Sequence, residues 1–188
     1  MIETLKKMFS PKEDTKIDEF EIFLEILESY MKTNYPKIKI DYSVSKHFEN
    51  ETNLKVRKSL MIENIVKQFQ NFEYIKTTQK SIQKDKLWNG YNLNSATNFK
   101  YPVDWLKRKE FVYRRDECCC NRCGKFLEEL TDVHTAFAKE IKDGGTYHFE
   151  NIIILCFDCY KIVDFNQNDS KGNLHISLND KLLDLVKN

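Results

Sequence analysis

The sequence contains no apolar run long enough to cross a membrane. Its longest uninterrupted one extends from Ile152 to Phe157, whereas a bilayer-spanning helix needs about 20 such residues. The first ten residues, MIETLKKMFS, also lack the apolar core of a secretory signal peptide. We therefore expect no membrane partner and a cytoplasmic protein, in which cysteines stay reduced and are free to bind metal.

The net charge gives no sign of a polyanion partner, because 30 Lys and Arg nearly balance 29 Asp and Glu. The charges are unevenly distributed, however. Twelve basic residues stand against five acidic ones from Lys76 to Lys125, and seven acidic residues against one lysine from Glu13 to Glu28. Any nucleic-acid surface must therefore be a local patch. The acidic segment is either a partner-binding face or an ordinary solvated helix face.

Four of the six cysteines form two Cys-x-x-Cys knuckles, Cys120 with Cys123 and Cys156 with Cys159, separated by 32 residues. One such pair alone is also typical of a redox dithiol, but two supply the four thiolates of a closed tetrahedral zinc site. A structural zinc contributes on the order of 10–16 kcal/mol of apparent binding free energy. We therefore predict structural Zn²⁺ at this site, without which this half of the chain unfolds.

The other two cysteines, Cys118 and Cys119, directly precede the first knuckle. They are predicted to be spare thiols, each of which is packed, reactive or a rival ligand.

Residues 1–75 are predicted to form a mainly helical region. Apolar residues at three- and four-residue spacing indicate a helix from Thr15 to the Tyr35-Pro36 break and a second one over residues 53–69. Between them, alternation over residues 38–44 predicts a half-buried strand. This region is interpreted as a target-recognition module or as an interaction domain for a protein partner.

Residues 76–100 show no regular pattern and are predicted to be a basic linker containing aromatic residues. Trp88, Tyr91 and Phe99 are interleaved with lysines, an arrangement that suits stacking on bases beside a phosphate backbone. The alternative is a connection whose aromatic residues dock on a neighbouring domain.

The sequence pattern changes at Tyr101. Residues 101–188 are predicted to form a separate domain, with its core at about 101–165. We expect a helix around Trp105 to Val112, a strand over 133–137, a loop at 142–146, and a short helix starting near Cys159. The tail alternates at Leu174, Ile176 and Leu178, as a strand does, before a last amphipathic turn. The predicted fold class is α+β.

These C-terminal motifs resemble the HNH endonuclease family. The resemblance covers about residues 101–165 and depends on the helix YPVDWLKRKEFVYRRD before the first knuckle, the Gly-Gly-Thr loop, and Glu150-Asn151-Ile152 running into the second knuckle. It implies a ββα-metal fold attached to the zinc knuckles. It also implies binding of DNA and hydrolysis of its phosphodiester bonds with a divalent metal, usually Mg²⁺ or Mn²⁺.

The resemblance assigns roles to individual residues. His134, on the first strand, is expected to be the general base or the metal ligand, and Asn151 to brace the loop as the central Asn. Arg114, Arg115 and Lys125 are the expected phosphate contacts. A neutral imidazole suits the base because its pKa lies near neutrality.

Two positions depart from the pattern of active members. Thr135 and Tyr160 stand where a second histidine and a histidine or asparagine are expected, and a neutral phenol is a poor magnesium ligand. Nearby side chains that would complete a rearranged site are Asp132, His148, Asp158 and Asp164. Two functions therefore remain open: a metal-dependent endonuclease, or a catalytically degenerate module that binds nucleic acid or protein.

Overall fold

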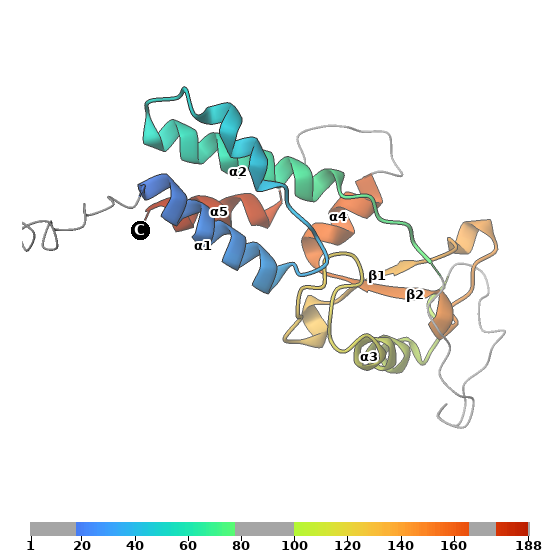
Figure 1. Cartoon of the computed structure of the whole chain (residues 1–188). Coiled ribbons are helices and arrows are strands. Elements are labelled where there is room, and N and C mark those ends of the chain that lie inside the picture. The colour runs from blue at the N-terminus through green and yellow to red at the C-terminus, as the bar shows by residue number, and fades with distance from the viewer. Residues whose placement is uncertain (1–17, 78–99, 166–175, 188) are drawn as a thin grey trace, which may run out of the picture.

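The structure, a computed structural model, describes residues 18–77, 100–165 and 176–187. Figure 1 shows a layer of long helices beside a small sheet that is flanked by helices on both sides. The helices are α1 (Glu19–Asn34), α2 (Leu54–Asn71), α3 (Trp105–Arg115), α4 (Phe157–Phe165) and α5 (Ser177–Lys187), the strands are β1 (His134–Phe137) and β2 (Ile152–Leu155), and short 3-10 helices cover Tyr42–Phe48, Leu130–Asp132, Ile141–Asp143 and Phe149–Asn151.

Helix α1 confirms the first predicted helix. Asp18 is its N-cap and accepts a hydrogen bond from the Phe20 amide at 3.0 Å, which satisfies one of the unpaired amides of the first turn. The predicted apolar stripe is buried at Phe20, Phe23, Leu27 and Met31. The helix ends at Tyr35 before the proline, as the sequence indicated. Ile17 lies outside the described residues.

Helix α2 confirms the second predicted helix, with one difference in its buried face. Asn53 caps it by accepting hydrogen bonds from two first-turn amides. Ile62 is buried in the core, whereas Val56, which the three- and four-residue spacing groups with the apolar residues of this helix, is exposed. The guanidinium of Arg57 instead covers the ring of Phe20 on α1, 3.8 Å from the ring centroid. Such cation–π contacts let a charged side chain cover an apolar residue.

The strand predicted over residues 38–44 is wrong. Residues 38–41 have no regular secondary structure and no partner strand, and a 3-10 helix follows from Tyr42. The side chain of Asp41 accepts a hydrogen bond from the Ser43 amide at 2.9 Å, so a local turn replaces a sheet ladder. The apolar members of the alternation nevertheless pack on the core. Residues 18–77 therefore contain no strand.

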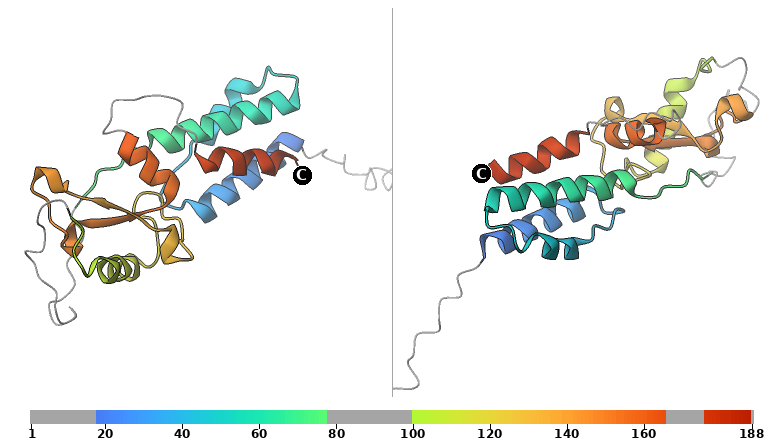
Figure 2. Two further views of the ribbon diagram at one scale, coloured as in Figure 1. Left: turned by 180° about the vertical axis from the view of Figure 1, so that it is seen from behind. Right: turned by 90° about the horizontal axis from the view of Figure 1, so that it is seen from above.

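Strands β1 and β2 form an antiparallel pair in which His134 lies opposite Leu155 and Phe137 opposite Ile152. All four residues of β2 are buried. An apolar run of this kind is typical of a strand that is covered on both faces. Helix α3 packs against β2 and α4 packs against β1, as the views in Figures 1 and 2 show. The hairpin and helix expected here are confirmed.

Helix α5 packs against α2 and joins the N-terminal helices, although it follows the hairpin in the sequence. Leu178 and Leu182 of α5 are buried in one hydrophobic cluster with Leu27, Phe69 and β2. Leu178 is therefore helical, and the strand-like alternation predicted for the tail is wrong at this position. Leu174 and His175 lie outside the described residues, as do Trp88, Tyr91 and Phe99 of the predicted linker.

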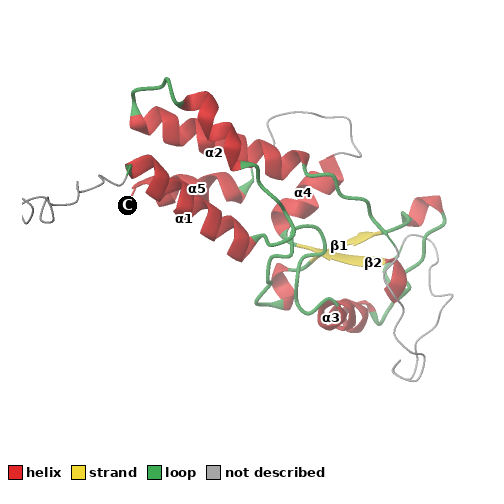
Figure 3. Cartoon of the chain, viewed as in Figure 1, coloured by secondary structure: helices red, strands yellow, loops and turns green. Residues whose placement is uncertain are grey.

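The secondary structure in Figure 3 is mostly helical with one small sheet, which confirms the α+β class. Among the residues that the structure describes, no helix is long and apolar enough to cross a membrane. The division into residues 1–75, 76–100 and 101–188 stays a prediction.

Candidate functional site

The four knuckle cysteines converge on one point of the structure. Cys120, Cys123, Cys156 and Cys159 are all buried, and their sulfur atoms lie within 4.8 Å of one another. The sulfurs of Cys123 and Cys156 are 3.8 Å apart, close to the edge of a tetrahedron whose metal–sulfur bonds measure about 2.3 Å. These four cysteines are therefore positioned to hold a metal ion, and their donor set fits zinc.

The backbone of the first knuckle fixes this geometry. The Gly124 amide donates to the Cys120 carbonyl at 2.8 Å, and the Cys120 amide donates to the Lys125 carbonyl at 2.8 Å. Gly124 has φ +80°, and a Cβ atom there would lie 2.9 Å from Cγ of Pro36. Only glycine adopts this conformation at this close approach without strain. The knuckle is thereby packed against the end of α1.

Arg122, between the two cysteines of the first knuckle, joins the metal site to α2. Its side chain is only 2% exposed. Nη1 donates to the Cys159 sulfur at 3.5 Å, and Nη2 donates to the carbonyls of Phe69 and Phe72 at 2.6 and 3.1 Å. A cation near a helix C-terminus stabilises the unpaired carbonyls and the dipole there. The same cation partly offsets the negative charge of the thiolates.

The side chain of Asn151 is hydrogen-bonded across the loop between the two strands. Its Nδ2 donates to the carbonyls of Lys139 and Thr146 at 2.9 and 2.8 Å, and its Oδ1 accepts from the Lys139 amide at 2.8 Å. Gly145 lets the loop close, because a Cβ atom there would lie 2.0 Å from the Lys139 carbonyl oxygen. Asn151 is thus buried in the scaffold and holds the loop against the hairpin.

His134 begins β1, and its ring faces α4. It stacks on the ring of Tyr160, with centroids 5.1 Å apart and 23° between planes, and it lies 5.3 Å from the ring of Phe157. Burial, followed by the charge of Lys109, lowers the pKa of His134 below 6.5, against the opposing effect of Asp132. The imidazole is therefore neutral at pH 7, as a general base or a metal ligand must be.

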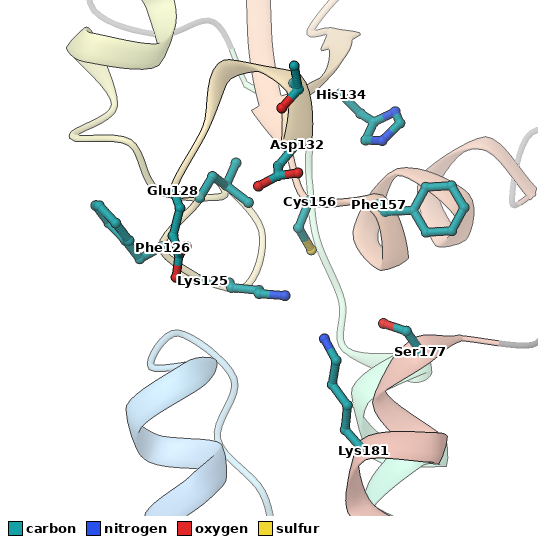
Figure 4. A pocket seen from close by; sticks show the side chains of 11 residues that line it. Lys125, Phe126, Glu128, Asp132, His134, Cys156, Phe157, Ser177 and Lys181 are labelled. Atoms are coloured by element: carbon teal, nitrogen blue, oxygen red, sulfur yellow. The ribbon is translucent and has the colours of Figure 1, made fainter.

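A cavity of about 480 Å³ lies next to His134. Figure 4 shows its lining side chains, which come from the loop after the first knuckle, from β1, from α4 and from α5. Basic and acidic side chains both contribute, namely Lys125 and Lys181 on one hand and Glu128 and Asp132 on the other. The cavity therefore combines an imidazole, two ammonium groups and two carboxylates beside the metal site.

The side chains considered for a rearranged catalytic site are not gathered at His134. Asp132 shares its cavity, but His148 lines a different one beside the glycine loop. Asp158 is buried, and its two carboxylate oxygens accept hydrogen bonds from the amide and hydroxyl of Ser177 at 2.8 and 2.7 Å. The side chain of Asp164 lies outside what the structure describes.

The donor set at His134 does not fit a magnesium ion. Throughout the described residues, the four cysteines are the only group of three or more His, Cys, Asp or Glu side chains close enough to share a metal. The face opposite His134 presents the phenol of Tyr160. Magnesium prefers several oxygen ligands in an octahedral arrangement, which this pair does not supply.

The three expected phosphate contacts differ in their availability. Lys125 lines the cavity. The side chain of Arg114 is 75% exposed and pairs with Glu110 one turn earlier in α3. Arg115 contradicts the expectation, because its side chain is 8% exposed. Its guanidinium pairs with Asp116 and donates to the carbonyls of Phe149 and Ile152 at 2.6 and 3.0 Å, so it fixes the hairpin to α3.

The two spare thiols lie outside the cluster. Cys118 and Cys119 are half-buried and do not belong to the four-cysteine group. Cys118 has φ +57°, and the Cys119 sulfur lies 3.3 Å from the Glu117 carbonyl. The turn that they form directs the chain from α3 into the first knuckle.

Sequence reasoning missed Arg122 and Lys181, and it considered Asp158 only for a rearranged catalytic site and not as the residue that holds the start of α5. Arg122 and Asp158 occupy the variable positions of the two knuckles, and their partners on α2 and α5 are distant in sequence. Lys181 lies on the last described helix. The only sequence signal for Arg122 and Asp158 was that a charged residue stands between two cysteines of a knuckle. That signal does not identify the residue to which the charged side chain binds.

The hairpin and the helix after it form a ββα region, beside which the four thiols are positioned to hold a metal ion. Residues 120–163, less than a quarter of the chain, match the family model described as HNH endonuclease. This segment contains all four cysteines, His134 and Asn151, so the C-terminal half carries an HNH-type region with four cysteines positioned for a zinc site. Searches of curated proteins and of solved structures each gave no match.

Proposed function

We propose that this protein binds DNA through its HNH-type region, which a structural zinc ion stabilises, and that the cavity beside His134 receives the phosphate backbone. The observation that carries this proposal is the position of the cavity. It opens within the segment that matches the family, next to the strand histidine, and Lys125 supplies a positive charge to it. Lysine ammonium groups are suitable phosphate contacts in proteins.

Zinc has a scaffold role in this proposal. Four buried thiolates leave no open coordination position, which is typical of structural zinc and not of catalytic zinc. Cys120, Cys123, Cys156 and Cys159 would hold the ion, which ties the loop that carries Lys125 to the start of α4. The cavity borders the site because Cys156 also lines it. Zinc binding and the shape of the cavity are therefore coupled.

Binding without cleavage is favoured by the pairing of His134 with Tyr160. In that arrangement the position opposite the histidine is filled by a stacked aromatic ring. The phenol at that position is a poor ligand for a magnesium ion. In this interpretation, His134 lines the binding surface and Asn151 keeps the adjoining loop rigid.

The second candidate function is metal-dependent hydrolysis of DNA phosphodiester bonds. It is supported by the lowered pKa of His134, which leaves a neutral imidazole to accept a proton from water, and by Asp132 in the same cavity. A general base of this kind contributes typically 10²–10⁴-fold to a rate. To bind Mg²⁺ or Mn²⁺, the Asp132 carboxylate and the His134 imidazole would have to move closer to each other.

Both candidates are tested with zinc-loaded protein and DNA. Binding to a duplex is measured by fluorescence anisotropy between about 50 and 200 mM salt, since each neutralised phosphate releases counterions and steepens the salt dependence. Plasmid nicking is then measured at low salt with Mg²⁺ or Mn²⁺. The matched variants are His134→Ala and His47→Ala, because His47 is an exposed histidine far from the cavity in the sequence.

Salt-dependent binding without nicking is the expected result. Nicking that His134→Ala abolishes and His47→Ala preserves would instead establish the hydrolytic function. Absence of DNA binding by folded, zinc-loaded protein at low salt would overturn the proposal.

A further inference from the structure

Two lysines from distant parts of the chain meet in the His134 cavity. Lys125 directly follows the first knuckle, and Lys181 lies on α5, outside the segment that matches the family. Figure 4 shows their ammonium ends pointing toward the same space, below Asp132 and beside Ser177. This convergence depends on the tertiary fold, since 55 residues separate the two lysines in the sequence.

The position of Lys181 is fixed from α4. Asp158 holds the start of α5 by accepting hydrogen bonds from the amide and the hydroxyl of Ser177. Ser177 and Lys181 are four residues apart on one helix and therefore lie on the same face. That face lines the cavity. Asp158, inside the second knuckle, thus sets the position of Lys181 relative to the metal site.

The two ammonium groups have no counter-ion of their own in the described structure. Neither lysine forms an ion pair with a carboxylate among residues 18–77, 100–165 and 176–187. Loss of hydration in the cavity and then the charge of Lys125 lower the pKa of Lys181, while the charges of Asp158 and Cys156 oppose this effect. Two like charges held this close favour an anion between them.

We propose that Lys125 and Lys181 form a clamp for one phosphate group of a nucleic-acid backbone. This inference rests on the proposed function and extends it, because it names a contact that α5 supplies from outside the HNH-type segment. A tetrahedral phosphate accepts hydrogen bonds from two ammonium groups at once. The clamp places the bound backbone at the mouth of the cavity, next to His134.

The competing explanation is structural. Four thiolates with one zinc ion carry two negative charges, and Cys156 borders the same cavity. The lysines would then serve to neutralise the metal site, as Arg122 does through its hydrogen bond to Cys159. A neutralising lysine affects zinc retention, whereas a phosphate clamp affects the salt dependence of DNA binding. The two roles are therefore separable by measurement.

The test uses the full chain, zinc-loaded, with a short DNA duplex as the probe. Lys181→Ala is compared with Lys181→Arg and with Lys55→Ala, which removes an exposed lysine on α2. The logarithm of the affinity is measured against the logarithm of the salt concentration. Zinc content and circular dichroism are recorded for each variant. Inorganic phosphate is titrated separately while the amide resonances of α5 are followed by NMR.

We expect Lys181→Ala to weaken binding and to reduce the magnitude of the salt slope by about one, the value for one lost phosphate contact. Lys181→Arg should restore the slope, and Lys55→Ala should leave it unchanged. Inorganic phosphate should shift the α5 resonances of the wild type and not those of Lys181→Ala.

The results that overturn the clamp are distinct from those that overturn DNA binding. Wild-type binding with an unchanged slope in Lys181→Ala refutes the clamp and leaves the proposed function in place. A loss of zinc in Lys181→Ala, together with an unchanged slope, assigns the structural role to the lysine. Failure of the wild type to bind DNA refutes the proposed function, and a phosphate-dependent shift at α5 would then still support an anion site there.

Discussion

The guanidinium of Arg122 donates a hydrogen bond to the Cys159 sulfur and also holds the carboxyl end of α2. One buried side chain therefore connects the metal site to the N-terminal helices. The guanidinium also makes cation–π contacts with the rings of Phe69 and Phe72, whose centroids lie 5.2 and 5.4 Å from the guanidinium carbon. The helical layer and the zinc knuckles are thereby parts of one structural unit.

Arg122→Ala should destabilise the zinc-loaded protein by on the order of 3 kcal/mol, because it leaves buried carbonyls without donors and a thiolate without its cation. Denaturant unfolding of zinc-loaded protein measures this change. Arg114→Ala is the matched control, since an exposed ion pair contributes little. Equal stability of the two variants would contradict the role assigned to Arg122.

Cys156→Ser should abolish tight zinc binding and unfold the HNH-type region, because a structural zinc supplies on the order of 10–16 kcal/mol. Metal analysis and near-ultraviolet circular dichroism report the two effects. Cys119→Ser should retain a full equivalent of zinc, since Cys119 lies outside the four-cysteine group. If Cys119→Ser loses zinc as Cys156→Ser does, the ligand set is different from the one described here.

Asn151→Ala should loosen the loop between the strands at a cost of about 2 kcal/mol, because two carbonyls and one amide lose their partner. Hydrogen exchange of the Lys139 amide is the direct measurement, and it should accelerate. Asn50→Ala changes an exposed asparagine and should leave the exchange unaltered. Unchanged protection at Lys139 in the Asn151 variant would show that the loop is held by other contacts.

The lowered pKa of His134 makes stability depend on pH. The unfolded state binds a proton to this histidine at a higher pH than the folded state does, so stability should fall as the pH drops below about 6.5, the ordinary histidine value. As the pH drops below about 6.5, the His134→Gln variant should lose less stability than the wild type does. Another partly buried histidine, His148, is unchanged in the variant and therefore contributes equally in both proteins. Parallel stability profiles for the two proteins would refute the shift, and an NMR titration of the ring gives its direction independently.

The parts of the fold that local pattern determines were predictable from the sequence. The knuckle spacing identified all four thiols, and three- and four-residue spacing located α1, α2 and α3. The alternation at residues 38–44 was misleading because an irregular segment followed by a 3-10 helix also turns every second residue toward the core. No local signal distinguishes that arrangement from a strand, since only the absence of a neighbouring strand decides it.

Side-chain roles at the site were less predictable, because charge alone does not reveal a partner. Arg114 and Arg115 look equivalent in the sequence, yet one is exposed and the other is buried against Asp116 and two carbonyls. For Asn151 the family resemblance offered a specific expectation, and its hydrogen bonds to Lys139 and Thr146 are consistent with a bracing role. Lys181 had no such support, since its proximity to Lys125 arises only when α5 packs on α2.

The packing of α5 on α2 also has a consequence for biosynthesis. The ribosome releases α1 and α2 first, then the knuckles and hairpin, and α5 only afterwards. The apolar face of α2 that α5 covers in the folded protein therefore stays uncovered until a helix more than 100 residues later has been synthesised. Late in this interval, once Cys159 has been added, the nascent chain contains both knuckles. Zinc capture is then able to precede completion of the helical layer and to give α5 a formed surface on which to dock.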